Sequence, residues 1–185
     1  QGSIALIGPL ADPRNNLPGC WSTGDKPKKY STIKEAMQRY LGDKATVTYA
    51  QGSNIYDDSV RQASVDFGRP IPRGDAKQML AEALKTAKNA DVIVACLGEM
   101  AEMSGESSAR TDLTMPDAEA RLLKALVRTG KPVVLLNFAG RPTVLSWEND
   151  NVAAIMNVWF AGSETGDAIC DVLFGDKVPT GKLVN

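Results

Sequence analysis

The chain has 185 residues, enough for one α/β domain with a substantial core, and its formal net charge is −1. The densest basic stretch, Lys26-Pro27-Lys28-Lys29, is short, so nucleic acid is not expected as a partner. The absence of histidine excludes a self-contained Ser-His-Asp or Cys-His site and removes the commonest zinc ligand. Any acid–base chemistry must therefore use carboxylates, tyrosine, lysine or cysteine.

Strand and helix patterns alternate along the whole chain. The expected strands cover residues 3–7, 46–50, 90–97, 132–138 and 153–158. The expected helices cover 33–41, 76–87, a segment capped by Thr114 and closed by Gly130, a short piece at 144–147, and a segment that Gly175 ends. Residues 51–73 are polar and contain Gly, Pro and Asp, so little regular structure is expected there.

This alternation predicts the fold class. It is α/β: a three-layer α/β/α sandwich with a mainly parallel, doubly wound sheet of about five to six strands. Residues 1–185 are expected to form one domain. The chain opens directly on a strand and stops at 182–185 as another strand begins, so we expect a piece of a longer protein.

The remaining global features add few constraints. Cys96 and Cys170 lie within apolar patterns and are expected to be buried, and Cys20 makes the cysteine number odd, so these residues do not reveal the redox compartment. No apolar run approaches the roughly 20 residues of a membrane-spanning helix, and no signal peptide is visible. No Gly-x-Gly-x-x-Gly fingerprint occurs, and the glycines from Gly175 to Gly181 are spaced wrongly for a P-loop.

A long loop over residues 98–113 carries most of the candidate chemistry. Its main charged residues are Glu99, Glu102, Glu106, Arg110 and Asp112. The loop follows a buried strand, and ligands of open α/β sheets bind at the carboxyl ends of the strands. Long loops in compact domains also tend to be functional. The residues alone leave a second interpretation open, in which the charges only keep a surface loop soluble.

Trp21 is the other candidate. It lies in a loop rich in Gly, Pro and Asn, and its indole either packs on the core or stacks against a ligand ring.

Ordered motifs cover nearly the whole chain and carry a resemblance to a known family. They lie at 3–11, 19–22, 90–94, 98–99, 104–113, 130–134, 159–176 and 179–183. Together they resemble the second, C-terminal α/β-sandwich domain of family 3 glycoside hydrolases, in the periplasmic β-glucosidase-like branch. The resemblance implies an enzyme in which an N-terminal barrel domain supplies an aspartate nucleophile and this domain supplies the general acid/base.

The resemblance also implies roles for the loop residues. The family's Ser-Gly-Glu-x-x-x-Arg pattern places the general acid/base on Glu106, with Glu102 as the alternative because the loop varies in length within the family. Glu99 is expected to brace the loop, and Arg110 to orient it through Asp112 or a glutamate.

Trp21 matches an aromatic residue at the entrance to the family's site. The resemblance therefore raises stacking on a sugar to equal standing with core packing.

The implied activity is that of a retaining β-glucosidase-like exo-glycosidase. It would hydrolyse terminal β-D-glucosyl or related residues of β-linked oligosaccharides or aryl glycosides, without cofactor or metal, in the periplasm or after secretion. The isolated domain is expected to be inactive because the nucleophile is absent. The alternatives are a non-catalytic carbohydrate-binding or assembly module of the same fold, and a nucleotide-binding domain, which the missing phosphate loop disfavours.

Overall fold

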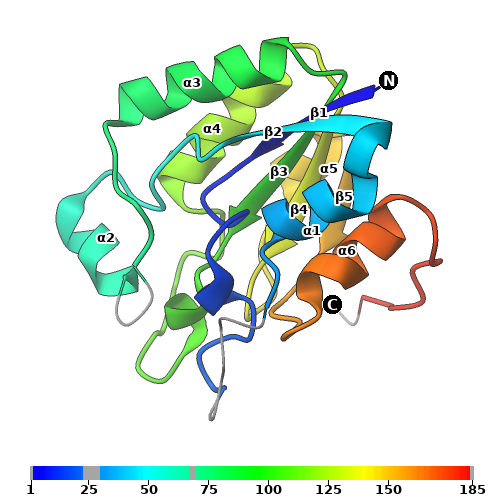
Figure 1. Cartoon of the computed structure of the whole chain (residues 1–185). Helices are drawn as coiled ribbons and strands as arrows, with labels where there is room; N and C mark the ends of the chain where they lie inside the picture. Colours follow the sequence, from blue (N-terminus) through cyan, green and yellow to red (C-terminus); the bar gives the residue numbers. More distant parts are fainter. Residues whose placement is uncertain (1, 23–29, 67–69, 184–185) are drawn as a thin grey trace.

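Five parallel strands form one sheet in the computed structural model, which describes residues 2–22, 30–66 and 70–183. The strands are β1 (Gly2–Ile7), β2 (Ala45–Ala50), β3 (Val92–Gly98), β4 (Val133–Phe138) and β5 (Ala154–Asn157). Their order is β2-β1-β3-β4-β5, and every neighbouring pair is parallel (Figure 1). The predicted parallel α/β sheet is therefore confirmed.

Helices cover both faces of this sheet. They are α1 (Ile33–Leu41), α2 (Ser59–Val65), α3 (Ala76–Lys88), α4 (Asp117–Val127), α5 (Ser146–Asn151) and α6 (Thr165–Leu173), with 3-10 turns η1 (Arg14–Asn16), η3 (Gly42–Lys44) and η4 (Ala101–Ser104). Figure 1 shows α1 and α6 on one side of the sheet and α3 and α4 on the other. None of the helices in the described residues has the length and apolar character needed to cross a membrane.

Side chains of the central strand alternate between the two cores. In β3, Val94 and Cys96 join the core beneath α1 and α6, whereas Ile93, Ala95 and Leu97 join the core beneath α3 and α4. An unbroken apolar run is what a strand buried on both faces requires. The burial of Cys96 and Cys170 is confirmed as well.

The expectation of little regular structure over 51–73 missed α2 (Ser59–Val65), which lies within that stretch. Asp58 caps the helix by accepting a hydrogen bond from the Arg61 backbone N–H. The buried Gln62 accepts hydrogen bonds from the backbone N–H groups of Ile55 and Tyr56 at 3.0 and 2.9 Å. A polar residue thus anchors the inner face of this helix, and apolar periodicity gives no signal for it.

The predicted cap at Thr114 was also wrong. The Thr114 hydroxyl donates to Asp112 Oδ1 at 2.7 Å, and α4 begins only at Asp117, after Pro116. Proline disfavours helical geometry in the residue before it, so the helix cannot extend back through Met115. The expected helix at 144–147 forms two residues later, as α5.

Parts of two expectations fall outside the described residues. The basic stretch at 26–29 does so entirely. Of the strand expected to begin near the last residues, Lys182 and Leu183 are described and are not in a strand, while 184–185 lie outside.

The backbones of β3 and β4 approach each other closely at Gly98, the last residue of β3. A Cβ at Gly98 would lie 2.0 Å from the Phe138 carbonyl oxygen, and the Gly98 φ of 129° is one that L-residues rarely adopt. We expect Gly98→Ala to lower the free energy of unfolding by more than about 3 kcal/mol, measured by urea denaturation. Gly130→Ala is the control. Gly130 also has positive φ, but apart from Gly130 itself and its two chain neighbours, no described residue places a heavy atom within 4 Å of where its Cβ would be, so the loss should stay near about 1–2 kcal/mol. Equal losses at the two glycines would contradict the close approach.

Candidate active site

The candidate site lies at the carboxyl ends of β1 and β3. The chain leaves β1 toward α1 on one face and leaves β3 toward α4 on the other. Ligands of open α/β sheets bind where neighbouring strands send their connections to opposite faces. Figure 1 shows the loops that follow β1 and β3 side by side at this edge of the sheet.

Direct contacts join the loops at this edge. Asn16, from the loop after β1, accepts a hydrogen bond from the Ala101 backbone N–H at 2.7 Å. A Cβ placed on Gly105 would lie 3.3 Å from the Cys20 sulfur. A Cβ placed on Gly140, after β4, would lie 2.3 Å from Ser104 Cβ. The loops after β1, β3 and β4 therefore pack as one unit.

Glu99 is the centre of this unit and is only 1% exposed. Its carboxylate accepts hydrogen bonds from four groups: Arg110 Nη1 (2.6 Å), Ser104 Oγ (2.8 Å), Arg141 Nε (3.3 Å) and the Gly140 backbone N–H (3.4 Å). These donors belong to the loop that follows β3 and to the turn that follows β4. A buried carboxylate needs such partners, because leaving it unpaired would cost several kcal/mol.

The expected acid/base residues lie on the surface of the same loop. Glu106 is exposed in a turn that the Ser108 N–H closes onto the Gly105 carbonyl at 3.2 Å. Glu102 is half-buried in η4, and the Ser108 hydroxyl bonds to its backbone carbonyl at 2.7 Å. The loop thus presents Glu106 to solvent, while the contacts of Glu99 hold the part of the loop next to the sheet.

Arg110 and Asp112 have different partners. Arg110 pairs with Glu99 and also donates to the Thr114 carbonyl at 3.0 Å. Asp112 accepts hydrogen bonds from the Thr114 hydroxyl and backbone N–H, and these bonds hold the pKa of Asp112 below its ordinary value. Arg110 therefore links Glu99, at the start of the loop, to Thr114, just beyond its end.

Trp21 is 71% exposed, so its indole does not fill the core of this domain. The neighbouring Cys20 is half-buried and lies against Gly105, which brings the loop that carries Trp21 beside the one that carries Glu106. An exposed indole offers an apolar face on which a sugar ring can stack.

Glu119, in α4, is a site residue that sequence reasoning missed. Its carboxyl group is fully buried and accepts the Gly98 backbone N–H at 3.2 and 3.3 Å, directly before Glu99. Burial raises the pKa of Glu119 well above its ordinary value, although the Gly98 hydrogen bond and the Arg110 charge oppose the shift. No local pattern distinguished this glutamate from exposed acidic residues of a helix's first turn.

Arg141 was missed too, although its position offered a signal. It follows β4 at the same edge of the sheet at which Glu99 follows β3. Parallel neighbouring strands bring such residues together, so the turn at 140–142 could have been connected to the loop.

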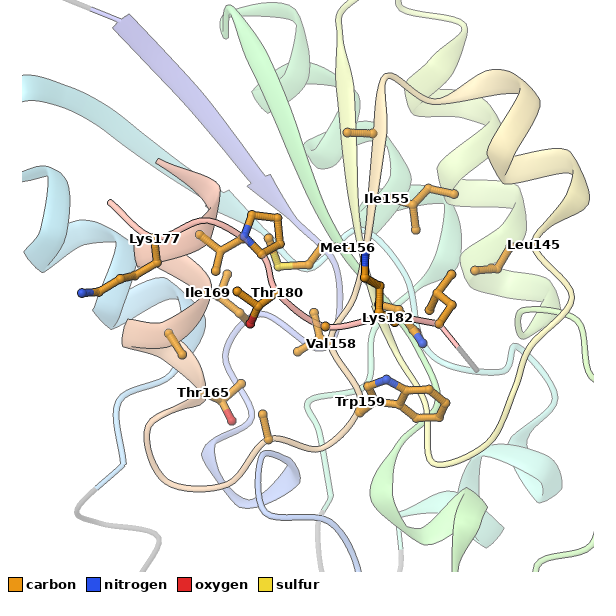
Figure 2. A pocket seen from close by; sticks show the side chains of 18 of the residues that line it. Leu145, Ile155, Met156, Val158, Trp159, Thr165, Ile169, Lys177, Thr180 and Lys182 are labelled. Atoms are coloured by element: carbon orange, nitrogen blue, oxygen red, sulfur yellow. The ribbon is translucent and has the colours of Figure 1, made fainter. Parts of the chain in front are cut away.

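A separate groove of about 1160 Å³ runs along β5, the edge strand. Figure 2 shows Met156 and Val158 facing Ile169 of α6, with Trp159 at one end and the segment carrying Thr180 and Lys182 crossing the groove. The residues that line it include no aspartate or glutamate. The groove therefore supplies no carboxylate for acid–base chemistry, and the loop that carries Glu106 remains the better candidate. Within the described ranges, no three His, Cys, Asp or Glu side chains gather into a group that could hold a metal ion.

Comparison with known proteins identifies the domain. The profile of the glycosyl hydrolase family 3 C-terminal domain matches residues 1–184. The chain belongs to this family. A periplasmic β-glucosidase of Salmonella typhimurium is 42% identical over 99% of the chain and 24% of its own length. A β-xylosidase of Formosa agariphila is 30% identical over 98% of the chain and 23% of its own length.

Solved structures of β-glucosidases and β-xylosidases contain a domain with the same fold as this chain. A β-glucosidase from Listeria innocua in complex with gluconolactone superposes with a TM-score of 0.77 at 25% identity, over 96% of this chain and 22% of that one. A family 3 exo-β-xylosidase reaches 0.76 at 28% identity, over 98% of this chain and 21% of that one. The family 3 domain described here thus spans less than a quarter of each of these four proteins.

The raised pKa of Glu119 predicts a pH-dependent effect of Glu119→Gln on stability. The folded chain keeps the Glu119 proton above the ordinary value of 4.5, where the unfolded chain releases it, so this group costs stability as pH rises. Glutamine stays neutral and can still accept the Gly98 N–H. Relative to wild type, Glu119→Gln should therefore become more stable as pH rises from about 5 to about 8, by up to about 1.4 kcal/mol per unit of pKa shift. Urea unfolding across this range measures the difference, and parallel curves for the two proteins would contradict the assignment.

Proposed function

We propose that the protein containing this domain is a retaining exo-β-glycosidase of the β-glucosidase type, and that the domain contributes its general acid/base. The observation that carries the proposal is the exposed Glu106, placed on a loop whose base is fixed by the buried Glu99 pairs. The relatives support it, because they are β-glucosidases and β-xylosidases. They are also much longer than this chain, which agrees with a second domain that supplies the nucleophile.

The proposed chemistry divides into two steps. In the first, a carboxylate nucleophile outside this chain attacks the anomeric carbon while Glu106 gives its proton to the departing glycosidic oxygen. In the second, Glu106 takes a proton from water, and the resulting hydroxide displaces the enzyme carboxylate from the sugar. Two displacements at the same carbon return the original β-configuration. The two carboxyl groups must lie about 5–5.5 Å apart for this mechanism.

Glu106 is preferred over Glu102 for this role. Glu106 occupies the glutamate of the Ser-Gly-Glu-x-x-x-Arg pattern and lies at the exposed turn, whereas Glu102 belongs to η4 at the base of the loop. A general acid must reach the glycosidic oxygen of a bound substrate, so exposure at the tip favours Glu106.

Glucose is the proposed terminal sugar, on β-linked oligosaccharides or aryl glycosides, because the most similar relative named above is a β-glucosidase. The β-xylosidase relatives make xylose the alternative. The periplasmic name of the Salmonella relative supports a periplasmic or secreted location for the parent protein.

Substitution of the two glutamates in the full-length protein distinguishes their roles. Glu106→Ala should lower kcat/KM on a disaccharide by about 100- to 10,000-fold, because a poor leaving group needs its proton in the transition state. On an activated aryl glucoside the first step survives, so we expect a burst of aglycone followed by slow turnover. Added azide should restore turnover and give a β-glycosyl azide, because azide needs no general base.

Glu102→Ala is the matched control within the same loop and should show neither burst nor azide rescue. If these signatures appear at Glu102 and not at Glu106, the acid/base assignment moves to Glu102. If neither variant shows them, the catalytic proposal fails and the non-catalytic binding module remains.

Trp21→Ala in the full-length protein tests stacking. The ring is largely exposed in this domain, so the free energy of unfolding should change by no more than about 0.5 kcal/mol. Loss of one stacked sugar should raise KM for oligosaccharides by about 2- to 10-fold, with little effect on small aryl glucosides. Steady-state kinetics on both substrate types measures the difference. A large loss of stability would instead assign Trp21 to packing.

A further inference from the structure

We propose that Arg141 is the positioning residue for the general acid/base: its guanidinium sets the shape of the loop that presents Glu106. The inference rests on the proposed function, because it gives a role to a residue that acts through the acid/base. Arg141 is not part of the Ser-Gly-Glu-x-x-x-Arg pattern. It lies 35 residues beyond Glu106 in the sequence and follows a different strand.

The contacts of Arg141 define this role. Its Nη2 donates to the Met103 carbonyl and, at 2.9 Å, to the Ser108 carbonyl. These two carbonyls bracket the turn that carries Glu106. One nitrogen thus holds both ends of a six-residue segment together, and the carboxylate lies between them in sequence. The Nε of the same guanidinium donates to Glu99 at 3.3 Å, which anchors the side chain to the buried carboxylate.

The backbone immediately before Arg141 is also held in place. The preceding Gly140 packs so closely on Ser104 that a side chain at position 140 would overlap it, and the Gly140 N–H donates to Glu99. The Arg141 side chain is only 21% exposed. It therefore reaches the Glu106 loop from a rigid support at the end of β4, and its donors face the loop's backbone.

Arg110 does not duplicate this function. Its donors go to Glu99 and to the Thr114 carbonyl, on the part of the loop that leads to α4. Arg141 alone among these two arginines holds the carbonyls on either side of Glu106. Lysine at position 141 would keep the positive charge beside Glu99, but its single ammonium group lacks the planar fork that spans a carboxylate and two carbonyls.

Arg141→Lys in the full-length protein, compared on two leaving groups, tests the inference. A displacement of about 1 Å in a catalytic group can cost about 100-fold in rate. We therefore expect kcat/KM on phenyl β-glucoside, a poor leaving group, to fall by about 30- to 100-fold. On 2,4-dinitrophenyl β-glucoside, which leaves without protonation, the fall in kcat/KM should stay below about 3-fold. Turnover of the dinitrophenyl substrate should increase with azide, because the displaced carboxylate is also a poorer base for water.

Three further variants make the outcome decisive. Arg128→Lys, at an exposed arginine that follows α4, is the control and should match wild type on both substrates. Arg141→Gln should show the same leaving-group selectivity as Arg141→Lys, because it also loses the fork. Glu106→Ala gives the full acid/base signature for reference. Thermal melting of each variant verifies that the domain is folded.

Each outcome is assignable. Equal losses on the two substrates without azide activation would show that Arg141 only stabilises the fold, and this would overturn the inference. If Arg141→Lys had the same ratio of kcat/KM values on the two substrates as wild type, the inference would also be overturned. The proposed function would still stand if Glu106→Ala showed the burst and the azide rescue. If neither Glu106→Ala nor Glu102→Ala shows the signature, the proposed function itself fails, and the inference fails with it.

Discussion

The buried carboxylate of Glu99 is the interaction on which the rest of the candidate site depends. It lies immediately beyond β3, is almost inaccessible to water, and collects hydrogen bonds from two arginines, a serine and a backbone amide. Removing one partner of a buried ion pair typically costs about 3–5 kcal/mol, because the remaining charge has no water to solvate it. Glu99 therefore needs these donors, and satisfying it fixes the segments that supply them.

The buried contacts of Glu99 allow the loop to be exposed at Glu106 and still be held in one position. For the proposed acid/base role, Glu106 must be open to a substrate, and an exposed turn has few buried contacts to hold it. Glu99, Arg110 and Arg141 provide those contacts beneath the turn, and the fully buried Glu119 holds the Gly98 amide at the point where the loop leaves the strand. The exposed Glu106 carboxylate is thus supported by buried contacts beneath it without being buried itself.

Much of the fold was predictable, because strands buried on both faces and amphipathic helices leave strong periodic signals. The run at 90–97 identified β3, and its position identified the loop that follows. Polar anchors gave no such signal: Gln62 in α2 and Glu119 in α4 are buried, but their sequence neighbourhoods resemble exposed helix surfaces. The cap at Thr114 failed because Asp112 offered a nearer partner and Pro116 prevented an earlier helix start. Local patterns describe local preferences, whereas these side chains respond to partners far away in the sequence.

The contact between Arg141 and the loop shows the same limit for the site. Glu106 was proposed as the acid/base from a contiguous pattern, but Arg141, which contacts the backbone on both sides of Glu106, lies beyond the next helix and strand. Only the pairing of β3 with β4 brings Arg141 and this loop together. In a two-domain retaining glycosidase, the distance between the two carboxylates depends on how each domain presents its own group. A loop held only by its own backbone would let that distance vary. Anchoring it to two adjacent strands of a close-packed sheet transfers the rigidity of the core to the proposed acid/base.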